Sequence, residues 1–168
     1  MAIIRNAVEE ELAYIRELRL AAYEEHATKI PEAHWQALRK SILSDGDIQN
    51  GVERIVAEGD GEILGSVALF SPDIKAYDGL LEEELGYPEL RMLAISPKAR
   101  GKGVATLLIK ECIKRAKETG FTEMGLHTAD FMEDAIKLYG HLGFERLPQF
   151  DFEPANDGII VKAFHIRF

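Results

Sequence analysis

Residues 100–103 read Arg-Gly-Lys-Gly, a composition that suits a loop binding phosphate. A mostly apolar stretch precedes them and ends at Ser96-Pro97, where proline stops a strand, and an apolar helical repeat follows. Glycines let the backbone approach an anion closely, and the free N–H groups of a first helical turn point outward with the positive end of the helix dipole. The two cationic side chains add full charges. The stretch therefore predicts a pyrophosphate site at the N-terminus of a helix.

The glycine spacing separates this loop from two common phosphate-binding motifs. The Walker pattern Gly-x-x-x-x-Gly-Lys-Ser/Thr is present only at its Gly-Lys, and the dinucleotide pattern Gly-x-Gly-x-x-Gly fails at its third glycine. Residues 100–105 instead read Arg-x-x-Gly-x-Ala, and here the sequence resembles the GNAT (GCN5-related N-acetyltransferase) superfamily. The alternative is an ordinary glycine turn before a helix. The resemblance implies that the loop holds the pyrophosphate of coenzyme A, through Arg100, Gly101, Lys102, Gly103, Val104, Ala105 and Thr106.

A second stretch, residues 135–144, resembles the other signature of that family, in which alanine precedes a Leu-Tyr pair and Gly-Phe ends a helix. The resemblance implies that Tyr139 is the general acid that protonates the coenzyme A thiolate, and a phenol of pKa about 10 is neutral and can donate. Met132 and Ala135 share its helix face and lie on the expected path of the pantetheine arm. Met132 stands where many members have asparagine, and it offers the arm no amide. The alternative for Tyr139 is a packed aromatic side chain.

Glu89 begins the central strand, where members of the family often carry a glutamate that acts as general base, directly or through water. The alternatives to a role as base are that the Glu89 carboxylate only attracts an ammonium group, or that it is a solvated charge at the end of a strand. His127 is an alternative base or a structural histidine. The resemblance also implies that the pantetheine pairs with the backbone of Leu93, Ala94 and Ile95 like an added strand, with an N–H near Ile95 polarising the thioester carbonyl.

The acceptor site has fewer signals in the sequence. His26 and His34 lie in or near the loop between the first two helices, where this superfamily frequently binds its acceptor, and Tyr77 lies in the long connection 71–88. We name His26, Tyr77 and His127 as candidate substrate contacts. The five histidines form no metal-binding pattern, so no metal is expected. Cys112 is expected to be a buried packing residue on an apolar helix face.

Length and composition favour one globular domain over residues 1–168, with 46% hydrophobic and 29% charged residues. The N-terminus is too short and polar for a signal peptide, and no apolar run reaches the length of a membrane span. A single cysteine excludes an internal disulfide and fits a reducing compartment. A cytoplasmic location is therefore expected.

The net charge of −9 is unevenly distributed along the chain. Residues 1–88 hold 8 lysines and arginines against 18 aspartates and glutamates, whereas residues 89–168 hold 12 against 11. Nucleic acid is not an expected partner, because binding it requires a basic face. An acidic rim would attract a cationic amine, and the alternative is a surface that only keeps the protein soluble.

Hydrophobic periodicity assigns the elements that must position these residues. Apolar residues at helical spacing predict helices over 8–23, 31–43, 103–119 and 132–140. Alternation and turn signals predict strands over 3–5, 52–57, 63–70, 89–96, 122–128, 145–147 and 159–168. In the third helix one apolar face is expected to hold Val104, Leu107, Leu108, Cys112 and Ala116. In the central strand, Leu90, Met92 and Ala94 are expected to alternate with Arg91, Leu93 and Ile95.

These patterns together predict an α/β fold of the GNAT type. A mixed, mostly antiparallel sheet is flanked by helices, and its two central strands are parallel, splayed and joined by the helix after the glycine loop. The implied function is direct transfer of an acetyl group from acetyl-coenzyme A to a primary amine of a small molecule. The alternatives are an acceptor at a protein N-terminus or lysine, another acyl group, and a coenzyme A-binding module without catalysis. A homodimer is common in the family.

Overall fold

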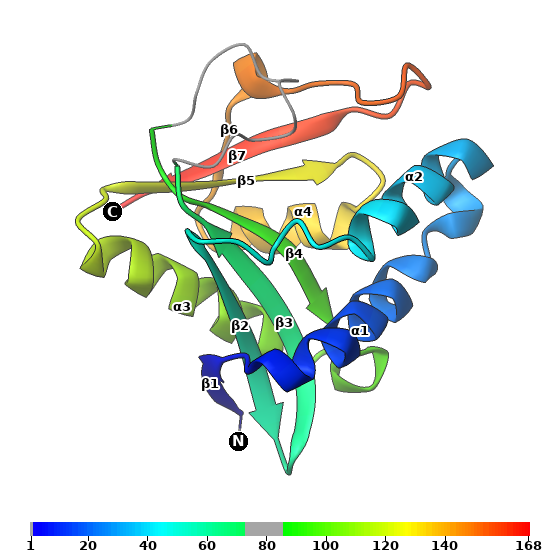
Figure 1. The fold of residues 1–168 in the computed structure, drawn as a ribbon. Helices are drawn as coiled ribbons and strands as arrows, with labels where there is room; N and C mark the ends of the chain where they lie inside the picture. The colour runs from blue at the N-terminus through cyan, green and yellow to red at the C-terminus, as the bar shows by residue number, and fades with distance from the viewer. Residues whose placement is uncertain (1, 73–85) are drawn as a thin grey trace.

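The structure, a computed structural model, describes residues 2–72 and 86–168 (Figure 1). Seven strands among these residues form one sheet, in the order β1-β2-β3-β4-β5-β7-β6. The strands are β1 (Ile3–Asn6), β2 (Val52–Gly59), β3 (Glu62–Phe70), β4 (Glu89–Ile95), β5 (Glu123–Ala129), β6 (Glu145–Arg146) and β7 (Val161–Arg167). The helices are α1 (Leu12–Glu24), α2 (Glu32–Ile42), α3 (Val104–Glu118) and α4 (Glu133–His141). Of the strands in the described part of the chain, only β4 and β5 pair in parallel, so the predicted fold class is confirmed.

The sheet separates two helical layers (Figure 1). The large core lies between the sheet and α3, with α4 closing one end, and its fully buried members include Ile55, Leu108 and Met124. A smaller cluster on the opposite face joins α1 to Ala94 of β4. None of the helices in the described ranges is long and apolar enough to cross a lipid bilayer.

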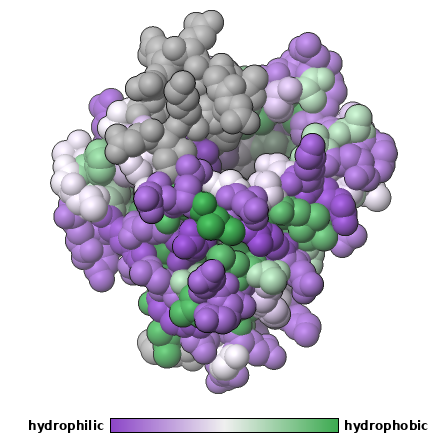
Figure 2. All heavy atoms as spheres, in the orientation of Figure 1, coloured by the Kyte–Doolittle hydropathy of each residue, from purple (hydrophilic) through white to green (hydrophobic). Residues whose placement is uncertain are grey.

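The surface seen in Figure 2 is mostly hydrophilic, with hydrophobic residues in small separate areas. Large apolar side chains that are well exposed come from scattered elements: Ile3, Val8, Tyr14, Leu43, Ile48 and Leu107. The exposure of Leu107 corrects the predicted apolar face of α3, in which Ile109 takes its place as a fully buried residue. At about 100° per residue, Leu107 lies farther from the centre of the stripe formed by Val104, Leu108, Cys112 and Ala116 than Ile109 does.

A buried ion pair fixes α1 over the sheet. The Arg19 guanidinium lies 2.9 Å from the Asp47 carboxylate, and their side chains are only 1% and 2% exposed. Asp47 belongs to the connection between α2 and β2, so the pair ties the middle of α1 to that connection. The predicted helix over 8–23 begins later than expected, because residues 9–11 form a separate 3-10 turn before α1.

Candidate functional site

A gap opens between β4 and β5 in the middle of the sheet. The two strands pair in parallel only at Glu89 with Gly125 and at Leu90 with Leu126. The rest of β4 stays paired with β3 on its other side, as far as Ile95 with Gly65. Beyond Leu90, the edge of β4 that faces β5 therefore has no strand partner among residues 2–72 and 86–168. This is the splayed pair that the sequence predicted.

A bulge in β4 shapes this open edge. The register between β3 and β4 shifts between Ser66 and Ala68, and Met92 has φ 57°, in the left-handed region that strand residues rarely adopt. One extra residue reverses which face every later side chain takes. The predicted strict alternation is therefore wrong after Met92: Leu93 and Ile95 join Leu90 in the core on the α3 side, while Ala94 packs under α1.

Backbone N–H groups of β4 are available in the gap. The Ser96 N–H donates to the Leu64 carbonyl of β3 at 2.8 Å. Successive residues of a strand direct their N–H groups to opposite sides, so the Ile95 N–H points toward the gap. The carbonyl of Leu93 accepts a 2.9 Å hydrogen bond from the Tyr23 hydroxyl of α1. No pattern in the sequence predicted this contact from α1.

The glycine loop lies directly after β4, at the start of α3. Gly101 and Gly103 have φ of 76° and 79°, and no atom lies within 4 Å of a Cβ built on either residue. Gly103 is the N-cap of α3, and no side chain caps this end of the helix. The first N–H groups of a helix have no intrahelical partner, so the donors of this turn are free for an anion. The exposed Lys102 adds a positive charge beside them.

Two residues assigned to the loop have contacts of their own. The Arg100 guanidinium donates to the Glu25 carboxylate at 2.6 Å and to the Ala22 carbonyl at 3.2 Å, both at the end of α1. Its hydrogen bond lowers the pKa of Glu25 below the ordinary value. Val104 is buried in the core, so only its backbone faces the loop. Ala105 and Thr106 are half-buried on the first turn of α3.

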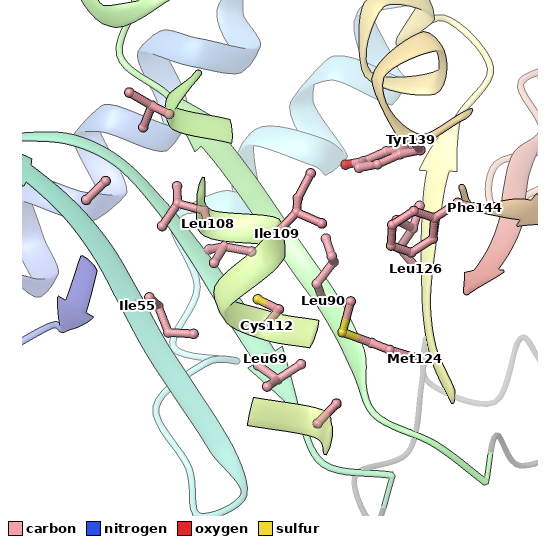
Figure 3. Packing of buried hydrophobic residues seen from close by; sticks show 14 of the residues in the cluster. Ile55, Leu69, Leu90, Leu108, Ile109, Cys112, Met124, Leu126, Tyr139 and Phe144 are labelled. Atoms are coloured by element: carbon pink, nitrogen blue, oxygen red, sulfur yellow. The ribbon is translucent and has the colours of Figure 1, made fainter. Parts of the chain in front are cut away.

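Tyr139 enters the gap from α4. Its side chain is buried, its ring packs against Phe144 and Phe164 at centroid distances of 5.7 and 6.3 Å, and its hydroxyl points toward β4 (Figure 3). Burial raises the pKa of Tyr139 above the ordinary phenol value, with a further contribution from Tyr23. The phenol is therefore neutral near pH 7 and holds a proton that it can donate. Ala135 is half-buried one turn earlier on α4.

Met132 is the N-cap of α4 and makes no side-chain capping bond. Its backbone N–H donates to the Ala129 carbonyl at 3.0 Å, which ties the start of α4 to the end of β5.

Glu89 is buried, with 3% exposure, which excludes the alternative of a solvated charge at the strand end. One carboxylate oxygen, Oε2, lies 2.7 Å from Nδ1 of His127, and the other, Oε1, lies 3.5 Å from the Arg91 guanidinium. His127 donates from Nε2 to the Phe150 carbonyl at 3.0 Å, since a carbonyl can only accept. Both ring nitrogens of His127 are therefore engaged, and Glu89 retains one oxygen, Oε1, that has no hydrogen bond from the described residues.

A second cluster forms around Phe131, between β5 and α4. The His26 ring lies 5.3 Å from it and the His34 ring 6.1 Å. His34 also lies 2.7 Å from the carboxylate of Asp157. Burial lowers the pKa of His26, which keeps its ring neutral near pH 7. The sequence named both histidines but neither of their partners, because these come from segments about 100 residues away.

Three further predictions have separate outcomes. Tyr77 lies outside the described residues. Cys112 is fully buried, as predicted, and burial raises the pKa of its thiol to about 12. Within the described residues, no group of three or more His, Cys, Asp and Glu side chains is arranged to hold a metal ion.

Comparison with known proteins places this geometry in a family. A model of the acetyltransferase (GNAT) family matches residues 12–144. An uncharacterized N-acetyltransferase of Escherichia coli, YjgM, is 36% identical over 92 residues, 55% of this chain and 50% of that protein. N-acetyltransferase family 8 member 2 of Rattus norvegicus is 28% identical over 115 residues, 67% of this chain and 47% of that protein. The chain spans about half the length of these curated relatives.

Solved structures share the fold. The PaiA N-acetyltransferase of Thermoplasma acidophilum, solved in complex with coenzyme A, superposes with a TM-score of 0.71 at 16% identity, covering 100% of this chain and 99% of that one. A GCN5-related N-acetyltransferase of Rhodopseudomonas palustris superposes with a TM-score of 0.75 at 16% identity, covering 100% and 96%. At this identity the likeness concerns the fold alone.

Proposed function

Because the chain belongs to the acetyltransferase (GNAT) family, we propose that it transfers the acetyl group of acetyl-coenzyme A to a primary amine of a small molecule. One observation carries the proposal. The pairing of β4 and β5 ends after Leu90, and the gap beyond it receives the Tyr139 hydroxyl while a glycine loop with free helix N–H groups follows β4 directly. A thioester donor needs this combination of an anion site, an open strand edge and a proton source.

The residues present fit coenzyme A. Gly101 and Gly103 leave open space over the N-terminus of α3, where a pyrophosphate would accept backbone N–H groups beside Lys102. Among the described residues no strand pairs with the gap-facing edge of β4 at residues 93–95, where Tyr23 already binds the Leu93 carbonyl, and the pantetheine amides can pair with the remaining groups of this edge. When bound, the cofactor supplies an acetyl group activated as a thioester.

Three groups of this chain would then carry the transfer. Oε1 of Glu89, held in place through Oε2 by His127, takes a proton from the acceptor ammonium directly or through water. The Ile95 N–H donates to the thioester oxygen as negative charge develops there. The Tyr139 hydroxyl gives its proton to the departing sulfur, and the raised pKa of Tyr139 keeps that proton in place at neutral pH.

The choice of a cationic acceptor rests on charge. Residues 1–88 hold 18 acidic against 8 basic side chains, and this excess comes from segments outside α1 and α2, which together hold 3 acidic and 4 basic residues. An amine that is an ammonium ion in water is attracted to this net negative charge.

The test is turnover of purified protein with acetyl-coenzyme A and a panel of acceptors, followed by release of free thiol. The panel contains diamines, polyamines, amino sugars and short peptides with free N-termini. Lys102→Glu should lower acetyl-coenzyme A affinity at least tenfold, because it reverses a charge beside the anion site. Lys110→Glu is the matched control, since Lys110 is exposed on the same helix beyond its first turn.

Three outcomes decide the proposal. Thiol release with a small amine supports it, and release with peptides alone moves the acceptor to protein N-termini. Binding of acetyl-coenzyme A without any turnover would replace it with a module that binds the cofactor and does not catalyse transfer.

A further inference from the structure

The hydroxyl of Tyr23 binds the open edge of β4. Tyr23 lies in the last turn of α1 and is partly buried, and its hydroxyl donates to the Leu93 carbonyl at 2.9 Å. Leu93 follows the bulge at Met92 and lies beyond the last rung shared with β5. A strand carbonyl at such an edge would normally be bound by a neighbouring strand or by water. Here a side chain from another layer of the fold takes that place.

This contact changes the electrostatics of the edge. An open strand edge presents both N–H and C=O groups, with opposite partial charges. A thioester oxygen that gains negative charge during attack is stabilised by N–H donors and repelled by a bare carbonyl nearby. Donation from Tyr23 offsets the negative end of the Leu93 carbonyl. The Ile95 N–H, which points to the same side, then stabilises the charge on the thioester oxygen with less repulsion from the Leu93 carbonyl.

Tyr23 also bears on the expected proton donor. After burial, Tyr23 is the next cause that raises the pKa of Tyr139. Burial raises the pKa of Tyr23 itself to about 12. Its hydroxyl therefore keeps its proton at neutral pH and goes on donating to Leu93.

Resting on the proposed acyl transfer, we propose that Tyr23 is a positioning residue for that reaction. It binds the Leu93 carbonyl and thereby offsets one of the acceptors on the gap-facing edge of β4, beside the Ile95 N–H that would donate to the thioester oxygen. Tyr23 acts through the backbone of β4 and takes no proton from substrate or cofactor.

The experiment compares wild type, Tyr23→Phe and Tyr14→Phe. Phenylalanine keeps the ring at position 23 and removes only the hydroxyl, so the packing against Leu18 and Ala22 of α1 is retained. Tyr14 is on the same helix and is 51% exposed, so its substitution is the matched control. The probe is acetyl-coenzyme A labelled with ¹³C at the acetyl carbonyl, and isotope-edited infrared spectra record the carbonyl stretch of the bound thioester. Calorimetry measures the Kd of the same ligand, and the unfolding temperature of each protein is recorded without ligand.

We expect the carbonyl stretch to lie lower in wild type and Tyr14→Phe than in Tyr23→Phe, because stronger donation to the oxygen weakens the C=O bond. The Kd should stay within about twofold, and kcat with the identified amine should fall about tenfold, as for loss of one supporting hydrogen bond. An unchanged stretch in Tyr23→Phe overturns the role of Tyr23, even if kcat falls, since packing alone would explain that. If the wild-type protein does not bind acetyl-coenzyme A, the proposed function itself is overturned. This result is distinguishable because it is seen without any substitution.

Discussion

Two glycines with the same backbone conformation allow a direct test of the phosphate loop. Gly103 has φ 79° at the start of α3, and Gly61 has φ 78° in the turn between β2 and β3. A Cβ added at either position meets no atom within 4 Å. Alanine at each position therefore carries the same left-handed strain, about 1 kcal/mol, with no clash. For a chain of this size, that strain lowers the unfolding temperature by about 2–4 °C in both variants.

The two variants should differ only when acetyl-coenzyme A is present. A ligand that binds the native state at 100 times its Kd stabilises it by about 2.7 kcal/mol, or about 5–10 °C here. At Gly103 the new methyl group takes up the space through which the backbone approaches the pyrophosphate. We expect at least a tenfold loss of affinity, which removes about 1.4 kcal/mol of that stabilisation. Gly61→Ala should retain the full ligand-induced shift.

The assay is a thermal-unfolding titration with acetyl-coenzyme A on wild type and both variants, with calorimetry for the Kd. The comparison uses the ligand-induced shift of each protein against its own ligand-free value, so the common strain cancels. If Gly103→Ala and Gly61→Ala both retained the full ligand-induced shift, the assignment of the pyrophosphate to residues 100–106 would be refuted. If the ligand-induced shift were reduced equally in both variants, the effect would come from global destabilisation.

Three further predictions follow from the buried and paired groups. Tyr139→Phe should lower kcat about 100-fold or more while the packing of the ring and the cofactor Kd are retained. The measurement is steady-state thiol release, and an unchanged kcat would contradict the role of Tyr139 as the acid. Asp47→Asn should cost about 3–5 kcal/mol in urea unfolding because it leaves Arg19 buried without its counter-ion, whereas Asp45→Asn, at a side chain 83% exposed, should cost little. Hydrogen bonds from a neighbouring arginine and a backbone N–H lower the pKa of Glu11 to about 2, so its contribution to stability is present above the ordinary value of 4.5 and is lost as pH falls toward 2. Unfolding temperatures of wild type and Glu11→Gln should therefore converge between pH 4.5 and 2, and a constant difference would contradict this.

The elements themselves could be predicted from the sequence because they depend on local patterns. Every predicted helix and strand is present with ends displaced by a few residues, and the parallel pair joined by α3 is confirmed. Leu107 shows the limit of this approach, since both it and Ile109 fit an apolar stripe. Which one is buried depends on how α3 is rotated against the sheet.

The candidate site could be predicted only in part. The types and spacing of residues 100–106 and of Ala135 and Tyr139 predicted a loop and a helix for coenzyme A, and this assignment stays a prediction. Glu89 could be named, but its burial beside His127 could not be predicted, because the two residues come from strands joined through α3. Tyr23 carried no signal at all, since an aromatic residue at the end of an amphipathic helix is ordinary.

The sequence by itself determined the order of elements, the glycine loop and the phenol on α4, because periodicity, glycine conformation and residue chemistry act over short stretches of chain. Only the tertiary structure decided where the β4–β5 gap opens, how the bulge at Met92 reverses the faces of β4, and which side chains meet there. Those features depend on strand register and on the packing of α1 against β4. Both are set by contacts between residues far apart in the chain, and local pattern does not encode them.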